Sequence, residues 1–312
     1  MIKKTLYFGN DAYLHTKDNQ LVVEFADKEK PSAKVPIEDV GIVILDAHRL
    51  TISQRLISRL LDNNTALITC NQKRMPQGLM LNLHGHNIQQ EKFHNQINAT
   101  KPLKKQLWQQ TIKQKINNQS RLMSLVTLIS LDELSKMDYW SRSVRSGDPD
   151  NYEARAAAYY WSKLFEVFVE TFTRGRFEEP PNNLLNYVYA ILRAITARSL
   201  VASGLLPTFG IHHHNKYNAY ALADDIMEPY RPFADFLVYQ VMDENQEELE
   251  ETGSIELTTA IKSRLLILPT LDVMLDGQKS PLMIAMQRTT ASLSSCFDGV
   301  QRNILYPEFP MD

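Results

Sequence analysis

The sequence has few cysteines, no long apolar run and almost no net charge. Two cysteines in 312 residues exclude a disulfide-stapled scaffold and a four-cysteine zinc site. No stretch approaches the roughly 18–20 apolar residues that cross a bilayer, and the start of the chain lacks the apolar core of a signal peptide. A net charge of −2 gives no global sign of a nucleic-acid partner, which must therefore be sought in local patches. We expect a soluble protein of a reducing compartment, the cytoplasm, with no membrane partner.

What is present is an ordinary globular composition, 44% hydrophobic and 22% charged, whose pattern changes near residue 90. Before that point, short β-branched and aromatic runs alternate with turn signals, and Thr51–Asp62 alone has helical spacing. The predicted strands are Lys4–Phe8, Ala12–His15, Gln20–Phe25, Val40–Leu45, Ala66–Cys70 and Gly78–Leu83, with a hairpin turn at Lys17-Asp18-Asn19. We therefore predict a β-rich domain over residues 1–90 and a linker over residues 91–100.

Residues 101–312 have helical periodicity almost throughout. Helices are predicted from about Lys101, from after Asp148 to about Gly175, from Pro181 to Ser203, from Tyr220 to Met242 with an interruption at the prolines 229 and 232, and over Ile255–Leu268 and Ser280–Phe297. The acidic stretch 243–256 is expected to be an exposed linker. The predicted fold class is α+β, a small N-terminal β-rich domain followed by a larger all-helical domain that carries the candidate catalytic groups.

The first candidate is the carboxylate of Glu153, near the start of the helix expected after Asp148. The small residues Ala156 and Ala157 share its helix face and would let another backbone approach closely. Glu153 could then be partly buried and chemically active. Alternatively, it is a first-turn glutamate that interacts only with the dipole of its own helix.

The second candidate is the triplet His212, His213 and His214, which lies between two predicted helices. In an extended segment, His213 would face one way and its two neighbours the other. Periodicity does not say which side carries chemistry. The triplet could also be a solvated polar loop or an incidental metal-binding tract.

The third candidate is the pair Asp225 and Glu228, which lie about one turn apart on one helix face. Two like charges there repel unless a cation or a basic group lies between them, although an exposed acidic turn would also accommodate them. Together with Glu153 and one histidine they form a mixed oxygen and nitrogen set, which suits Mg²⁺ or Mn²⁺ with open coordination positions. Because such metals polarise phosphoryl oxygens, these residues indicate metal-dependent phosphoryl transfer or hydrolysis.

Basic residues are concentrated in one part of the chain. The sequence between Glu91 and Asp132 contains seven basic residues and no acidic residue. Such a patch could neutralise the phosphates of a polyanion, or it could be a solvated helix face. The candidate DNA-binding residues are Lys101, Lys104, Lys105, Lys113, Lys115, Arg121, Arg142, Arg145 and Arg231.

Three ordered blocks carry a family resemblance: DPDNYEARAA at 148–157, GIHH at 210–213 and DIMEPYRP at 225–232. With Tyr7-Phe8-Gly9 near the start, the chain resembles the CRISPR-associated integrases (CRISPR-associated protein one), which insert new spacers into CRISPR arrays. The resemblance implies metal ligands at Glu153, His213 and Glu228, because the family's Gly-x-x-His spacing selects His213. Asp225, His212 and His214 then become secondary candidates. The ending EPYRP is similar to that of single-effector (type II) systems.

The resemblance also implies partners and a reaction. A homodimer built by the β domain would be bridged to a second dimer by a small ferredoxin-like partner (CRISPR-associated protein two). The implied reaction is transesterification, in which the 3′-hydroxyl ends of new double-stranded spacer DNA attack the repeat DNA beside a bound metal. Two alternatives remain, a metal-dependent endonuclease without strand transfer and a non-catalytic DNA-binding scaffold.

Overall fold

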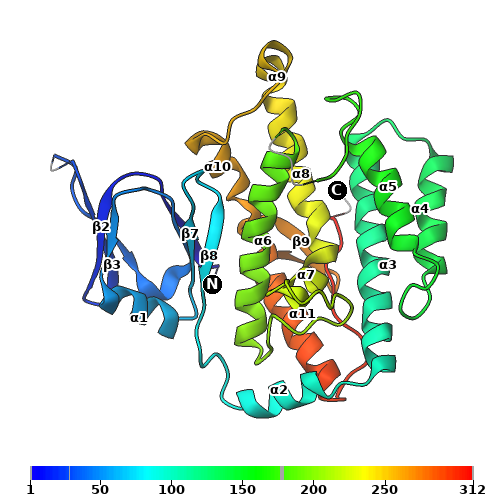
Figure 1. The fold of residues 1–312 in the computed structure, drawn as a ribbon, viewed down its shortest axis with the longest axis horizontal. Helices are drawn as coiled ribbons and strands as arrows, with labels where there is room; N and C mark the ends of the chain where they lie inside the picture. Colours follow the sequence, from blue (N-terminus) through cyan, green and yellow to red (C-terminus); the bar gives the residue numbers. More distant parts are fainter. Residues whose placement is uncertain (1, 28, 176–178, 311–312) are drawn as a thin grey trace. The chain divides into compact units, whose positions relative to one another are not determined.

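The computed structural model describes residues 2–27, 29–175 and 179–310 and divides into two units, residues 1–89 and 90–312 (Figure 1). The first unit holds two four-stranded sheets and the second is mostly helical, so the α+β class is confirmed. Among the described residues, no helix is both long and apolar enough to cross a membrane.

The first unit is built from two sheets and the helix α1 (Gln54–Asp62). One sheet has the order β1-β5-β7-β8, with strands Lys4–Phe8, Val40–Leu45, Ala66–Cys70 and Pro76–Met80. The other has the order β4-β3-β2-β6, with strands Ala33–Pro36, Gln20–Phe25, Ala12–Lys17 and Leu50–Ile52, and η1 (Ile37–Asp39) precedes β5. Apolar side chains of both sheets, together with Leu56 and Leu60 of α1, form one core.

Local sequence accounts for most of this unit. The continuous apolar run of β5 is buried because it pairs in parallel with β1 and β7. Asp18 and Asn19 both have positive φ, as a two-residue hairpin turn between β2 and β3 requires. The predicted helix 51–62 begins only at Gln54, since residues 50–52 form β6 beside β2. The strand predicted at 78–83 lies instead at 76–80, where it pairs with β7.

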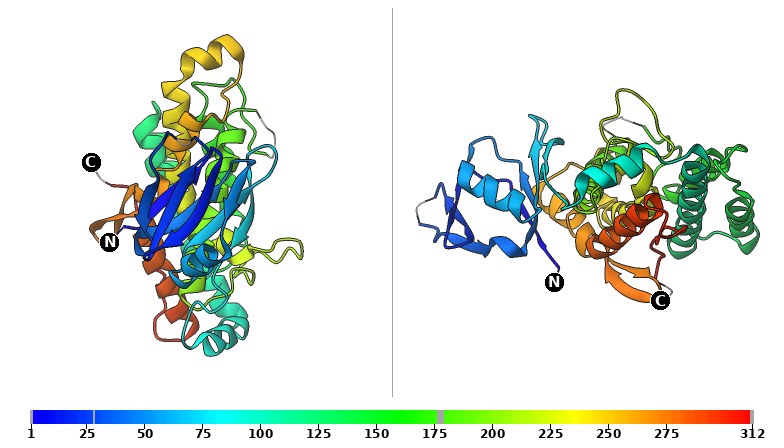
Figure 2. Two further views of the ribbon diagram at one scale, coloured as in Figure 1. Left: turned by 90° about the vertical axis from the view of Figure 1, so that its left-hand side faces the viewer. Right: turned by 90° about the horizontal axis from the view of Figure 1, so that it is seen from below.

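The second unit contains the remaining elements. Its helices are α2 (Gln89–Ile97, which begins one residue before the unit boundary), α3 (Lys101–Val126), α4 (Leu131–Ser143), α5 (Tyr152–Leu164), α6 (Asn182–Ala202), α7 (Ala221–Met227), α8 (Arg231–Glu244), α9 (Gln246–Thr252), α10 (Thr259–Leu265) and α11 (Leu282–Phe297). Short η2 (Glu228–Tyr230) and η3 (Leu268–Thr270) turns and a hairpin of β9 (Asp272–Leu275) and β10 (Gln278–Pro281) complete it. The hairpin packs against α11 (Figure 2), so this unit is mostly, not entirely, helical.

Helix α3 is the centre of this unit, with α4 and α5 on one side and η2 and α8 on the other (Figure 1). Its start is as predicted: the hydroxyl of Thr100 accepts a hydrogen bond from the amide of Leu103. The apolar stripe that predicts this helix consists of Leu103, Leu107, Ile112 and Ile116; Leu103 is half-buried and the other three are buried. Because neighbours cover the helix on several sides, polar residues that no apolar pattern marks are buried as well.

A buried carboxylate joins three further helices. Asp235 of α8 accepts hydrogen bonds from the hydroxyls of Tyr160 in α5 (2.7 Å) and Tyr189 in α6 (2.5 Å). Burial raises the pKa of Asp235 to about 6, although both hydroxyls stabilise its ionised form. Tyr160 lies two turns after Glu153 on the same helix, so this network fixes the helix that carries Glu153.

Three sequence predictions for this unit are wrong. Residues 91–100 are not a linker, because α2 covers most of them and buried Gln96 donates hydrogen bonds to the carbonyls of Leu206 and Phe209. The helix with Glu153 ends at Leu164, not near Gly175, since the chain turns back and Phe172 packs on Trp161. The acidic stretch 243–256 contains α9 and is therefore not a linker, although its acidic residues are all exposed, as predicted, while the apolar residues 249 and 255 are buried.

Asn118 of α3 provides a test of this packing. Its side-chain amide donates to the carbonyls of Pro229 (2.7 Å) and Pro307 (2.9 Å) within the core. We expect Asn118→Ala to lower the free energy of unfolding by about 2–4 kcal/mol, because two buried carbonyls lose their partner. The measurement is urea unfolding followed by tryptophan fluorescence, which reports this unit because all three tryptophans lie in it.

The matched control is the adjacent Asn117, whose side chain is exposed on the same helix. Asn117→Ala should change the free energy of unfolding by no more than about 0.5 kcal/mol. Equal losses in the two variants would contradict the structural role of the Asn118 amide.

Candidate functional site

The position of Glu153 is fixed by a cap at the start of α5. Asn151 has a left-handed conformation, and the carboxylate of Asp148 accepts hydrogen bonds from the amides of Tyr152 (3.0 Å) and Glu153 (2.9 Å). These contacts satisfy amides that the helix leaves without partners. Glu153 is indeed a first-turn glutamate, but its carboxylate also binds the ammonium of Lys115 on α3, at 2.8 Å.

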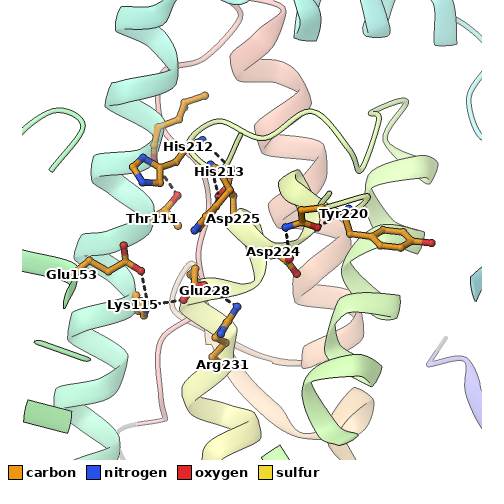
Figure 3. Close-up of polar contacts among 12 residues, drawn as sticks. Thr111, Lys115, Glu153, His212, His213, Tyr220, Asp224, Asp225, Glu228 and Arg231 are labelled. Atoms are coloured by element: carbon orange, nitrogen blue, oxygen red, sulfur yellow. Dashed lines mark hydrogen bonds and ion pairs between the residues drawn. The ribbon is translucent and has the colours of Figure 1, made fainter. Parts of the chain in front are cut away.

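His213 is fixed by Asp225, a fully buried residue of α7 (Figure 3). The carboxylate of Asp225 accepts hydrogen bonds from the amides of His212 (2.9 Å) and His213 (3.3 Å), and it also binds Nδ1 of His213. This hydrogen bond raises the pKa of His213. With Nδ1 engaged, the tautomer inferred from these contacts leaves the lone pair on Nε2 free to bind another group.

Gly210 is required by the close approach of this loop to α7. A Cβ atom at Gly210 would lie 2.6 Å from the carbonyl oxygen of His213 and 2.7 Å from Oδ2 of Asp225. Oδ2 of Asp225 cannot move without breaking the hydrogen bonds that it accepts from the amides of His212 and His213. The spacing of Gly210 and His213 in the sequence therefore has a steric cause.

The other two histidines differ from His213. The ring of His212 stacks on Trp108 of α3, with centroids 4.1 Å apart and planes 2° apart, and desolvation of the stacked ring lowers its pKa although the residue is exposed. His214 is exposed. The rings of Trp108 and His213 are also in contact in a T-shaped arrangement, with centroids 5.6 Å apart. Trp108 therefore packs against both histidine rings. Its contribution was missed from the sequence because the predicted stripe on this helix did not include it.

Glu228 lies directly after α7 and is buried, with 3% of its surface exposed. Its Oε2 lies 2.6 Å from Nζ of Lys115 and its Oε1 3.0 Å from the guanidinium of Arg231. Burial acts to raise the pKa of Glu228, but the charges of Arg231 and Lys115 outweigh it and hold that pKa below its usual value. Glu228 is therefore an ionised carboxylate within the protein core.

Lys115 is the cation that joins the two glutamates. Its ammonium bridges Glu153 and Glu228, and its side chain is only 10% exposed (Figure 3). Burial acts to lower the pKa of Lys115, but the two carboxylates outweigh it and the pKa is raised. The sequence prediction required a cation or a basic group between Asp225 and Glu228. The structure places the basic group between Glu153 and Glu228, while Asp225 binds the histidine loop.

Whether these residues suit a divalent metal follows from their chemistry. Across residues 2–27, 29–175 and 179–310, no three His, Cys, Asp or Glu side chains lie close enough together to hold a metal ion as they stand. However, Glu153 and Glu228 already hold one cation between them, and both carboxylates raise the pKa of His213 through their charge. Two carboxylates and an imidazole within electrostatic reach of one another are a donor set that fits Mg²⁺ or Mn²⁺.

The candidate DNA-binding residues separate into two groups. Seven lie on the outer surface of the unit, five of them exposed (Lys101, Lys105, Arg121, Arg142 and Arg145) and two half-buried (Lys104 and Lys113). The loop that carries Arg145 is joined to α3 by a hydrogen bond from the amide of Gly147 to the carbonyl of Lys105 (3.0 Å). In contrast, Lys115 and Arg231 both bind Glu228, so the structure assigns them to the carboxylate cluster.

Comparison with known proteins identifies relatives along most of the chain. The sequence profile of the family "CRISPR associated protein Cas1" matches residues 6–266. The CRISPR-associated endonuclease Cas1 of Neisseria meningitidis serogroup C (strain 8013) is 33% identical over 299 residues, which cover 95% of this chain and 92% of that protein.

Two solved structures have a similar fold. A casposase bound to its integration product matches with a TM-score of 0.73 and 18% identity, over 97% of this chain and 92% of that chain. A chain of a Cas6-RT-Cas1–Cas2 complex matches with a TM-score of 0.71 and 19% identity, over 96% of this chain and 35% of that chain. At these identities the structures establish the fold alone. The family profile and the Neisseria relative establish more: this chain belongs to the Cas1 family of CRISPR-associated proteins.

Proposed function

We propose that this protein is a metal-dependent DNA integrase of CRISPR adaptation, which joins the 3′-hydroxyl ends of new spacer DNA to the repeat. The observation that carries the proposal is the cation site between Glu153 and Glu228, with His213 oriented beside it by Asp225. Membership of the Cas1 family, and the names of a relative called an endonuclease and a neighbour bound to an integration product, support the same function.

Glu153, Glu228 and Nε2 of His213 would hold Mg²⁺ or Mn²⁺. When bound, the metal would polarise the scissile phosphate and stabilise charge on its oxygens. The protein's own residues keep the ligands in place: Asp225 holds the imidazole, and Arg231 holds Oε1 of Glu228. Arg231 in turn stacks on the ring of Tyr189, with its guanidinium carbon 4.9 Å from the ring centroid.

The proposed reaction is one in-line displacement at a phosphorus atom of the repeat DNA. The 3′-oxygen of the spacer forms a new bond to phosphorus while the bond to the 3′-oxygen of the repeat strand breaks. The proton of the attacking hydroxyl leaves as the departing oxygen gains one, so no covalent enzyme intermediate and no external energy source are needed. Catalysis of such a step rests mainly on positioning and charge stabilisation.

The assembly is also part of the proposal. We infer a homodimer, bridged to a second dimer by a small ferredoxin-like partner, since a structural neighbour is a Cas1–Cas2 complex. The β unit holds no candidate ligand and is free to build these interfaces. The sequence EPYRP at 228–232 favours a type II system.

A strand-transfer assay separates integration from simple cleavage. DNA with labelled, pre-cut 3′-hydroxyl ends is incubated with a supercoiled plasmid that carries the repeat, with Mg²⁺, Mn²⁺ or EDTA. An integrase joins the label to the plasmid only when metal is present. An endonuclease without strand transfer nicks the plasmid and leaves it unlabelled, and a non-catalytic scaffold does neither.

Substitution of each proposed ligand should abolish strand transfer. We expect Glu153→Ala, His213→Ala and Glu228→Ala each to lower the rate by more than about a hundredfold, beyond the effect usual for residues that only surround metal ligands. Double substitutions should cost little more than single ones, because ligands of one metal act as a unit. The measurements are the rate of plasmid labelling and, as a check of folding, thermal unfolding.

The neighbouring histidines serve as controls within the same loop. His212→Ala removes a ring that stacks on Trp108, and His214→Ala removes an exposed ring, so both should reduce the rate less than His213→Ala does. If folded His212→Ala protein were as inactive as His213→Ala, the assignment of His213 as the ligand would be wrong.

The basic surface of α3 is expected to bind DNA phosphates. Reversal of Lys104, Lys105 and Arg121 to glutamate should weaken DNA binding and flatten its salt dependence. Each lost phosphate contact lowers the slope of log affinity against log salt by roughly one unit, so about three are expected for the triple variant. Fluorescence anisotropy of labelled duplex DNA between low and physiological salt measures the slope.

Lys279 provides a charge-reversal control, because it is an exposed lysine on β10, outside the basic stretch. Lys279→Glu should leave the slope unchanged. A slope that stays at the wild-type value in the triple variant would mean that the exposed face of α3 is solvated and that DNA binds elsewhere.

A further inference from the structure

Lys115 differs from the surface lysines 101, 104, 105 and 113 of the basic stretch because its ammonium lies between two carboxylates. Its Nζ lies 2.8 Å from Oε1 of Glu153 and 2.6 Å from Oε2 of Glu228. The Glu228 side chain is 4% exposed, so its ionised carboxylate has almost no access to water. Such a buried charge is tolerated only when a charge of opposite sign lies against it.

The ammonium and a divalent metal cannot both lie between these carboxylates. Magnesium binds carboxylate oxygens at about 2.0–2.1 Å, closer than the two contacts of Lys115, so a metal bound to Oε1 of Glu153 and Oε2 of Glu228 would lie where the ammonium lies. A second positive charge in the same space would also repel the first. Either cation satisfies the carboxylates, but only one at a time.

We propose that Lys115 is an internal cation that occupies the metal position of the metal-free protein and is displaced when a divalent cation binds. The inference rests on the proposed function, since it takes Glu153 and Glu228 as ligands of that metal. Lys115 thereby keeps the two carboxylates together before the metal arrives, and it lowers the affinity for the metal by competing with it.

The two basic partners of Glu228 differ in their freedom to move. The ammonium of Lys115 ends a flexible four-carbon stem. Arg231 binds the other oxygen of Glu228 and stacks on Tyr189, so its contact does not have to break for a metal to reach Oε2. Displacement therefore involves Lys115 alone, while Arg231 continues to orient Glu228.

The test compares Lys115→Met with Lys279→Met, a change that removes the same charge from an exposed site. Binding of Mn²⁺ is measured by calorimetry without DNA, and binding that Glu153→Gln abolishes defines the site. We expect Lys115→Met to bind Mn²⁺ at least about tenfold more tightly than the wild type, because no internal cation competes. Lys279→Met should match the wild type.

Stability supplies a second readout. In EDTA, Lys115→Met should unfold at a lower temperature than the wild type, since two carboxylates lose their counter-charge, and Mn²⁺ should restore most of the loss. Equal or weaker Mn²⁺ binding by folded Lys115→Met would overturn the competition. Failure of both proteins to show any binding that depends on Glu153 would instead overturn the proposed function, and the inference with it.

The wild-type protein tests the same idea if Lys115→Met does not fold. Lysines are acetylated briefly in EDTA or in saturating Mg²⁺, and the labelled fraction of each lysine is measured by mass spectrometry. Labelling of Lys115 should rise severalfold with Mg²⁺, while that of Lys279 stays constant. Unchanged labelling of Lys115 at saturating Mg²⁺ would show that the ammonium is not displaced.

Discussion

The need to neutralise buried carboxylates governs the arrangement of the helical unit. Glu153 and Glu228 come from segments 75 residues apart, and the buried carboxylate of Glu228 could not be ionised in the core without a positive charge. Lys115 on the central helix α3 supplies it for both, and Arg231 supplies a second charge for Glu228. The site is therefore an electrostatic junction of α3, α5 and the turn after α7, where one ammonium meets carboxylates from two segments.

Buried polar contacts join several helices of this unit. Asp225 accepts hydrogen bonds from the loop that contains His212 and His213. The amide of Asn118 links α3 to two backbone carbonyls, and Asp235 links three helices through two tyrosine hydroxyls. Hydrogen bonds of this kind fix direction as well as distance, whereas apolar contacts fix only proximity. The proposed metal site would require a particular imidazole nitrogen and particular carboxylate oxygens to face one point, and such directional contacts would hold them there.

Much of the fold is visible in the sequence. The apolar run of β5, the Asp18-Asn19 turn and the helix start at about Lys101 each specify local structure within a few residues, and the structure confirms them. The failures have a common cause. The strand β6 and the docking of α2 depend on partners distant in sequence, and α5 ends early because the chain turns back and packs Phe172 on Trp161; no local pattern reports these contacts.

The same division applies to the candidate site. The sequence by itself marked the acidic pair, the histidine triplet and the basic stretch, because charge and residue type are local properties. Only the tertiary structure determines which groups pair. In it, Lys115 points inward and binds Glu153 and Glu228, and Asp225 binds the histidine loop. Those pairings depend on which charged side chains are removed from water together. This is determined only when helices that are distant in sequence pack against one another.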